Sequence, residues 1–216
     1  MRCVRAGFLF AMTLGLALSV AAQGEAPRPA AGAAAAAANA GPGFEIQIPS
    51  FPDGGDFPLK YSDSGDRISP EIHWTNPPKG TVTYVLNFHD QNNARNKTTD
   101  DMLDWIVWNI PGDATGLPEA VPPGPQLANG ALQTSASGPG TYRGPGFTGG
   151  PTGMGAKHHY TFDVYAIDMK VDVPVNGEPF ETRQKIFQAI QGHVLGKAVY
   201  MGLFRRPPGP PPAGSR

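Results

Sequence analysis

The middle of the chain consists of short apolar segments separated by stretches that are dense in glycine and proline. Short runs with this punctuation favour β-strands joined by long loops. Because successive side chains of a strand point to opposite faces, every second residue shares a face. The predicted strands are Phe44–Ile48, Glu71–Trp74, Val82–Asp90, Trp105–Ile110, Tyr160–Ile167 and Ala198–Phe204.

One segment has a helical pattern instead. Its apolar stripe consists of Ile186, Phe187 and Ile190. Thr182 is a suitable N-cap and Gly192 a suitable terminator, so we predict a short helix over Thr182–Gln191. The helix comes late in the chain and is expected to pack on the edge of a β-sandwich or barrel. The fold class is therefore mainly β, with one or two short peripheral helices.

The two ends of the chain do not contribute to this domain. In residues 1–22, Arg2 and Arg5 precede the apolar run Phe8–Val20 and a group of small residues, which is typical of a secretory signal peptide. The run is too short to span a membrane. We therefore expect an exported protein, periplasmic or secreted, with no transmembrane segment in the mature chain.

The folded domain is expected to occupy residues 44–206. Residues 23–43 are rich in alanine and proline and lack large apolar side chains, so they read as a disordered linker. Residues 207–216 form a second disordered, proline-rich tail.

The charge and cysteine content narrow the functional classes. Without Arg2 and Arg5, the remaining 15 basic and 18 acidic residues give a net charge of −3. This balance does not favour nucleic acid as a partner, since nucleic-acid binders usually carry a basic patch. The single cysteine, Cys3, lies in the predicted signal peptide, so the mature fold must be held by its core and not by disulfides.

Three predicted strands carry a polar residue at one end of a core-facing row. The rows are Val82, Tyr84, Leu86 and Phe88 followed by Asp90; Asp104 followed by Ile106, Trp108 and Ile110; and His158 and Tyr160 followed by Phe162, Val164 and Ala166. A single charged residue at a strand end is usually just solvated. Three such ends would form a pocket if they met in space, which side-chain parity alone does not establish. A Gly/Pro-rich loop from Thr141 leads directly into His158 and could bring bare backbone close to a ligand.

Five blocks of the sequence resemble, in family order, those of the phosphatidylethanolamine-binding protein family in its bacterial Raf-kinase-inhibitor-like branch. The blocks are SPEIHWTNPPKGTVTYVLNFHD, DWIVWNIPGDATGLPE, YRGPG, HHYTFDVYAID and GHVLGKAVYMGLF, from about Ile68 to Phe204. The resemblance implies a β-sandwich with a small anion pocket near its surface, suited to a phosphate-bearing head group.

The resemblance also implies roles for individual residues. His158 and Tyr160 match the His-x-Tyr that lines the family's ligand site, where they would act as donors. Gly144 and Pro145 match the backbone wall of the pocket, and Asp90 would orient His158.

Two positions depart from the family pattern. Asp104 stands where the family has a second pocket histidine, and Asp90-Gln91-Asn92-Asn93-Ala94 replaces an Asp-Pro-Asp-Ala-Pro loop, which should therefore follow another path. Two carboxylates beside His158 disfavour phosphate unless a proton is taken up. We therefore expect a mixed site lined by Asp90, Asp104, Gly144, Pro145, His158 and Tyr160, which could also accept a cation or the ammonium end of a head group.

The most favoured function is binding of a small anionic or zwitterionic ligand, such as a phospholipid head group, without catalysis or a cofactor. A second reading is an interaction or inhibitor module that acts on a protein partner. A third is a hydrolase that uses Asp90 and Asp104, although the sequence suggests no aromatic sugar groove. No close His-x-His spacing supports a metal, and His73 and His89 read as structural or exposed residues.

Overall fold

The computed structural model describes residues 43–146 and 155–207, which form two β-sheets and one α-helix. The predicted signal peptide, almost all of the linker and tail, and the centre of the Gly/Pro-rich loop lie outside the described residues. Within the described part of the chain, no helix is long and apolar enough to cross a membrane.

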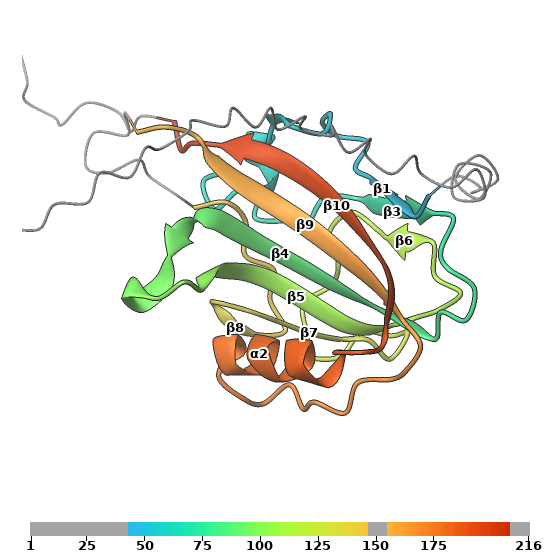
Figure 1. Cartoon of the computed structure of the whole chain (residues 1–216). Coiled ribbons are helices and arrows are strands. Elements are labelled where there is room, and N and C mark those ends of the chain that lie inside the picture. The colour runs from blue at the N-terminus through green and yellow to red at the C-terminus, as the bar shows by residue number, and fades with distance from the viewer. Residues whose placement is uncertain (1–42, 147–154, 208–216) are drawn as a thin grey trace, which may run out of the picture. The chain divides into compact units, whose positions relative to one another are not determined.

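The larger sheet has seven strands (Figure 1). In spatial order they are β2 (Gly55–Asp56), β10 (Val194–Phe204), β9 (His158–Ile167), β4 (Thr83–Ala94), β5 (Asp101–Pro111), β7 (Leu132–Ser135) and β8 (Gly138–Pro139). β2 runs parallel to β10, and the other neighbouring strands are antiparallel. Its long central strands are those with the clearest apolar rows in the sequence.

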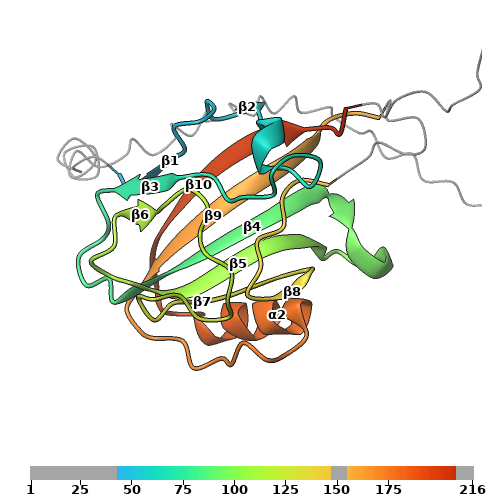
Figure 2. The same ribbon diagram turned by 180° about the vertical axis from the view of Figure 1, so that it is seen from behind.

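A smaller antiparallel sheet covers one face of the larger one (Figure 2). Its strands are β1 (Glu45–Gln47), β3 (Ile72–Thr75) and β6 (Gly116–Leu117). Aromatic side chains fill the space between the sheets, with the rings of Trp74 and Tyr84 4.9 Å apart and those of Phe88 and Phe162 4.1 Å apart. The mainly β, sandwich-like fold class is therefore confirmed.

The helix α2 (Pro179–Ala189) covers the opposite face of the larger sheet, where Ile186 packs with Ile106 and Trp108. The predicted helix is present, but its predicted N-cap was wrong. Glu178 caps the helix by accepting a hydrogen bond from the Glu181 amide (2.9 Å), and Pro179 occupies the first turn. Proline presets the helical φ at that position, so the helix begins before Thr182. Two short 3₁₀ turns complete the described helical structure, η1 (Leu59–Tyr61) and η2 (Arg95–Lys97).

β5 breaks the simple alternation that the sequence suggested. Trp105 and Val107 face the core between the sheets, whereas Ile106 and Trp108 face α2. The predicted row that joined Asp104 to Ile106 and Trp108 was therefore wrong. Two register shifts against β4 explain the difference, because each inserts one extra residue into β5 and changes which side chains share a face.

The six predicted strands are all present, within a few residues of their predicted ends. The prediction missed four short strands, β2, β6, β7 and β8. β7 and β8 lie in the stretch between the predicted strands Trp105–Ile110 and Tyr160–Ile167, where no strand was predicted. Their pairing with β5 and with each other is a tertiary effect, and strands of two to four residues carry little local pattern.

Candidate functional site

The ends of three central strands meet at one edge of the larger sheet. β4 lies between β5 and β9 and is antiparallel to both (Figure 1), so its end is beside their beginnings. Asp90 is the register partner of Met102 on β5 and of Tyr160 on β9. A pocket of about 210 Å³ opens there, lined by Asp90, Asn93, Met102, Asp104, Arg143, Gly146 and Tyr160. The structure thus brings together three of the residues singled out from sequence, namely Asp90, Asp104 and Tyr160.

Asp90 and His158 form a close pair beside this pocket. His158 Nδ1 lies 2.8 Å from Asp90 Oδ2 and 3.0 Å from Oδ1, and the Asp90 side chain is only 3% exposed. A carboxylate that holds one ring nitrogen fixes both the tautomer and the orientation of the imidazole. This is the geometry expected if Asp90 orients His158.

Asp104 reaches the pocket through a β-bulge. Phe88 pairs with Trp105 and His89 pairs with Leu103, which leaves Asp104 as the extra residue of β5. In a bulge, two residues oppose one and the bulged strand re-aims its side chains. Asp104 therefore lines the same pocket as Asp90, although Ile106 and Trp108 lie on the other face.

Asp104 is 1% exposed, and its Oδ2 makes no hydrogen bond with the described residues. Burial raises the pKa of Asp104 well above its ordinary value, against the opposing effect of Arg143, and the nearby Asp90 raises it further. The carboxyl is therefore biased toward its neutral, protonated form, which can donate a hydrogen bond.

Arg143 is the site residue that the sequence reasoning missed. Its guanidinium lies between two carboxylates, with Nη1 3.7 Å from Asp104 Oδ1 and Nε 3.6 Å from Asp63 Oδ2. The sequence did contain a signal for it. Asp104 stands where the resemblance implies histidine, and a buried acid needs a cation nearby. An arginine directly before Gly144 was the obvious candidate.

Gly144 and Pro145 make contacts other than those expected for a pocket wall. A side chain at Gly144 would approach the Tyr61 carbonyl oxygen to 2.1 Å, and the Pro145 carbonyl accepts a hydrogen bond from the Asp63 amide (3.1 Å). Neither is among the residues that line the pocket, whereas their neighbours Arg143 and Gly146 are. Glycine is required here because two backbone segments touch, and this contact sets the position of Arg143.

Hydrogen bonds of the Asp90 and Asn92 side chains hold the segment after Asp90. The Asn92 amide donates to Asp90 Oδ1 (3.0 Å), which closes a turn of the kind that Asp and Asn side chains commonly form. The Asn92 side-chain oxygen in turn accepts from the backbone amide of His159 (2.8 Å). These bonds tie the end of β4 to the start of β9, on either side of the pocket.

The chemistry of the pocket is mixed in charge. In the lining, Arg143 provides donors, Asp90 provides acceptors, and Asp104 can do either once it is protonated. His158 and Asp63 lie behind this lining, paired with Asp90 and Arg143. In the described part of the chain, no group of three histidine, cysteine or acidic side chains is arranged to hold a metal ion. The arrangement suits a small polar ligand that carries both a negative and a positive group.

A two-layer β fold with a small polar pocket where strand ends meet defines a ligand-binding type of domain. The sequence model of the family described as phosphatidylethanolamine-binding protein matches residues 47–205. The chain belongs to the phosphatidylethanolamine-binding protein family, as the resemblance of its sequence blocks implied.

Relatives in sequence are consistent with the bacterial branch of this family. The chain is 36% identical over 162 residues to a UPF0098 protein of Methanothermobacter thermautotrophicus, covering 74% of this chain and 98% of that protein. It is 32% identical over 111 residues to the UPF0098 protein YbhB of Escherichia coli, covering 50% of this chain and 66% of YbhB.

Solved structures share the fold. The phosphatidylethanolamine-binding protein homologue CT736 of Chlamydia trachomatis aligns with a TM-score of 0.63 at 25% identity, over 76% of this chain and 99% of that one. Escherichia coli YbcL, described as a member of the mammalian family, also aligns with a TM-score of 0.63, at 21% identity and with the same coverage. The likeness to YbcL concerns the fold alone.

Proposed function

We propose that the pocket at the ends of β4, β5 and β9 binds a small zwitterionic ligand of the phospholipid head-group type, with a phosphate and an ammonium group. The observation that carries the proposal is the placement of Arg143 and the Asp90–His158 pair around one 210 Å³ pocket with a buried acid, Asp104. A pocket of this size has room for about seven water molecules or a ligand of similar volume.

The charges of the lining residues support this ligand class. A phosphate accepts hydrogen bonds from Arg143 in the lining, and guanidinium groups match phosphate geometry especially well. His158, beside the pocket, adds a donor when its imidazole is doubly protonated, because Asp90 already holds Nδ1. The raised pKa of Asp104 favours its neutral form, which removes one repulsive charge. Asp90 remains as a partner for the ammonium group. A plain phosphate would lack this second interaction.

Calorimetric titration of the purified protein tests the proposal with phosphorylethanolamine, inorganic phosphate and ethanolamine. Phosphorylethanolamine should bind more tightly than either half alone. The variant Arg143→Met should weaken it by about tenfold or more, since a hydrogen bond to a charged group is lost. Lys79→Met, which removes an exposed cation outside the pocket lining, provides the control.

The phosphate affinity of the Asp104→His variant tests whether Asp104 makes the pocket less favourable for inorganic phosphate. The histidine variant should bind inorganic phosphate more tightly than the wild type does, because it exchanges an acid for a donor. Equal phosphate affinity in the two proteins would contradict the role assigned to Asp104. Phosphorylethanolamine binding that survived Arg143→Met unchanged would contradict the site itself.

We also propose that binding occurs without chemical turnover and that the protein is exported. Ligand recovered unchanged after incubation, measured by phosphorus NMR, is the expected result for a binding protein, and release of phosphate would contradict it. Export is supported by the charged start and the apolar run of residues 1–22. The mass of the protein recovered from its host should show loss of that segment.

A further inference from the structure

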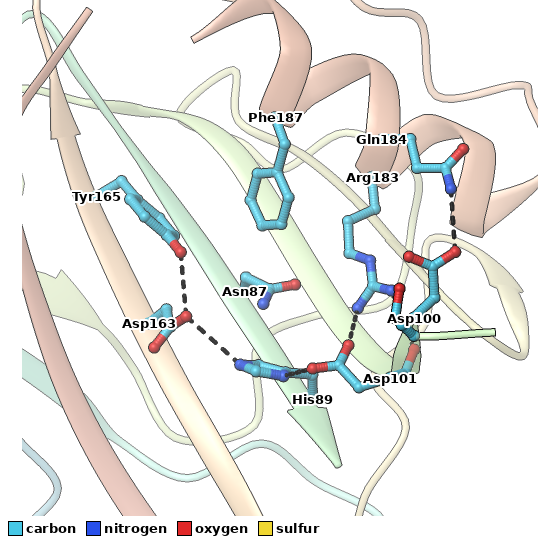
Figure 3. Close-up of a pocket in the computed structure, with 10 residues that line it drawn as sticks. Asn87, His89, Asp100, Asp101, Asp163, Tyr165, Arg183, Gln184 and Phe187 are labelled. Carbon is cyan, nitrogen blue, oxygen red and sulfur yellow. Dashed lines mark hydrogen bonds and ion pairs between the residues drawn. The ribbon is translucent and has the colours of Figure 1, made fainter. Parts of the chain in front are cut away.

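A second pocket lies on the other face of the larger sheet, beneath α2 (Figure 3). Its volume is about 310 Å³, at the lower end of the range for small-molecule sites. The lining comes from four elements and the loop before β5, and consists of Asn87, His89, Thr99, Asp100, Asp101, Asp163, Tyr165, Arg183, Gln184 and Phe187. His89 and Asp90 are neighbours on β4, so this pocket and the proposed head-group site lie on opposite faces of the sheet.

The charged groups of this second pocket neutralise one another. His89 lies between two carboxylates, hydrogen-bonded through Nδ1 to Asp101 and with Nε2 3.4 Å from Asp163 Oδ2. Burial alone would lower the pKa of His89, but these carboxylates raise it to about 9. Arg183 donates to Asp101 (2.6 Å), and Lys197 pairs with Asp163 (2.9 Å). The cluster therefore has no strong preference for a charged ligand.

Two polar atoms in the cluster have unused hydrogen-bonding capacity. Among the described residues, the buried Asn87 Oδ1 makes no hydrogen bond, and the buried His89 Nε2 has only its long pairing with Asp163 Oδ2, at 3.4 Å. The first is an acceptor, and the second is a donor while the imidazole is protonated. A buried polar group without a hydrogen bond usually costs stability, so its presence calls for an explanation.

Asn87 is only 2% exposed. In Figure 3 its amide lies in the middle of the surrounding side chains, between Phe187 and His89. Rotation about the second side-chain torsion, which is soft for asparagine, can present either end of the amide to a ligand. The amide is therefore positioned to supply both a donor and an acceptor.

One wall of the pocket is aromatic. The rings of Tyr165 and Phe187 come from β9 and α2 and meet edge to face, with centroids 5.7 Å apart. Their apolar surfaces adjoin the polar cluster, while Asp100 and Gln184 supply exposed polar groups and are joined by a 3.2 Å hydrogen bond. A ligand here would meet an apolar wall on one side and hydrogen-bonding groups on the other.

We propose that this pocket binds a small neutral polyhydroxy compound of the monosaccharide type. Each hydroxyl group both donates and accepts, which matches the unused acceptor on Asn87 and the donor on His89 that is held only at 3.4 Å by Asp163. The C–H face of a sugar ring can pack on an aromatic side chain. The internally paired charges favour an uncharged ligand, and the pocket volume, about that of ten water molecules, accommodates one sugar ring.

The experiment uses saturation-transfer NMR on the full-length protein with D-glucose, D-galactose and glycerol as probes. A ring-sized sugar should bind with a Kd on the order of 1 mM, given the usual affinity per ligand atom. Glycerol should bind more weakly because it lacks a ring to cover the aromatic wall. Cyclohexanol, with a ring but one hydroxyl, serves as the apolar comparison and should also bind more weakly than the sugars.

Two variants connect binding to this pocket. Asn87→Leu keeps the branching and the number of side-chain heavy atoms but removes the amide, and it should weaken sugar binding about tenfold, while the protein keeps or gains thermal stability because an unpaired buried group is gone. Phe187→Leu tests the aromatic wall in the same way from α2. Asp90→Asn, in the other pocket, should leave sugar binding unchanged and so separates this proposal from the head-group proposal.

Failure of both sugars to bind the wild type would overturn the proposal. So would binding that is unchanged in both Asn87→Leu and Phe187→Leu, since the sugar would then sit elsewhere. Sugar binding lost in Asp90→Asn but kept in Asn87→Leu would place the sugar in the pocket at the ends of β4, β5 and β9 and also overturn it. A folded Asn87→Leu protein that has lost only sugar binding is the result expected.

Discussion

The buried acid Asp104 should make the stability of the protein fall as pH rises above about 4. Burial raises its pKa well above that of an aspartate in the unfolded chain, which is about 3.9. Between these two values the folded protein holds a proton that the unfolded chain has lost. Folding then becomes less favourable with increasing pH, and the loss stops once pH passes the pKa in the folded state.

The size of the effect follows from one proton. In the pH range between the two pKa values, the free energy of unfolding should decrease by about 1.4 kcal/mol per pH unit from this group alone. Asp104→Asn removes the titration while keeping the shape of the side chain. The variant should therefore gain stability relative to the wild type by about that amount per pH unit above pH 4, and show no such gain at pH 3.

Urea unfolding followed by tryptophan fluorescence at half-unit steps from pH 3 to pH 7 measures this difference. Asp172→Asn is the control, because it removes the charge of an exposed aspartate outside the lining of either pocket. A difference between wild type and Asp104→Asn that stays constant with pH would refute the reasoning. So would a wild type that gains stability relative to Asp104→Asn as pH rises, since Asp104 would then be held as a carboxylate by Arg143.

Three further expectations concern other parts of the fold. Gly144→Ala should cost about 1–3 kcal/mol of unfolding free energy, because the new methyl group would meet the Tyr61 carbonyl oxygen at 2.1 Å. Gly43→Ala, where the methyl group would enter open space, should be nearly neutral in the same urea assay. The pKa of His89 is raised to about 9, so the free energy of unfolding of the wild type should fall by about 3 kcal/mol relative to that of His89→Gln between pH 6.5 and 9. A difference between the two proteins that does not change with pH would contradict this. Glu178→Ala should lower the melting temperature, because loss of the α2 cap costs about 1 kcal/mol of unfolding free energy, and an unchanged calorimetric melt would contradict the assigned cap.

The long strands could be predicted from sequence because their core-facing residues alternate along the local sequence. Tyr84, Leu86 and Phe88 alternate with residues of the other face, and this period alone indicates a strand. The two bulges of β5 could not be predicted in this way. They depend on how β5 pairs with β4, and Asp104 reaches the pocket only because one of them changes the facing of its side chain.

Part of the candidate site could likewise be predicted from the sequence. Asp90, Asp104 and Tyr160 were found because each stands at the polar end of a strand or in a family block, and the structure groups them in one pocket. Arg143 was missed because its role comes from a tertiary contact with Asp104 and Asp63. The pocket beneath α2 was missed for the same reason, since its lining is brought together from β4, β5, β9 and α2 by the tertiary fold.

The alternation of β4 has a consequence for how this protein can change. His89 and Asp90 are consecutive residues that serve pockets on opposite faces, so a point substitution can alter one pocket and leave the other intact. Insertion or deletion of a single residue within β4 would instead reverse the facing of every side chain beyond it and exchange the histidine and the aspartate. Length variation is therefore expected only after Asp90, where β4 already has extra residues between its pairings with Met102 and Asp101 of β5.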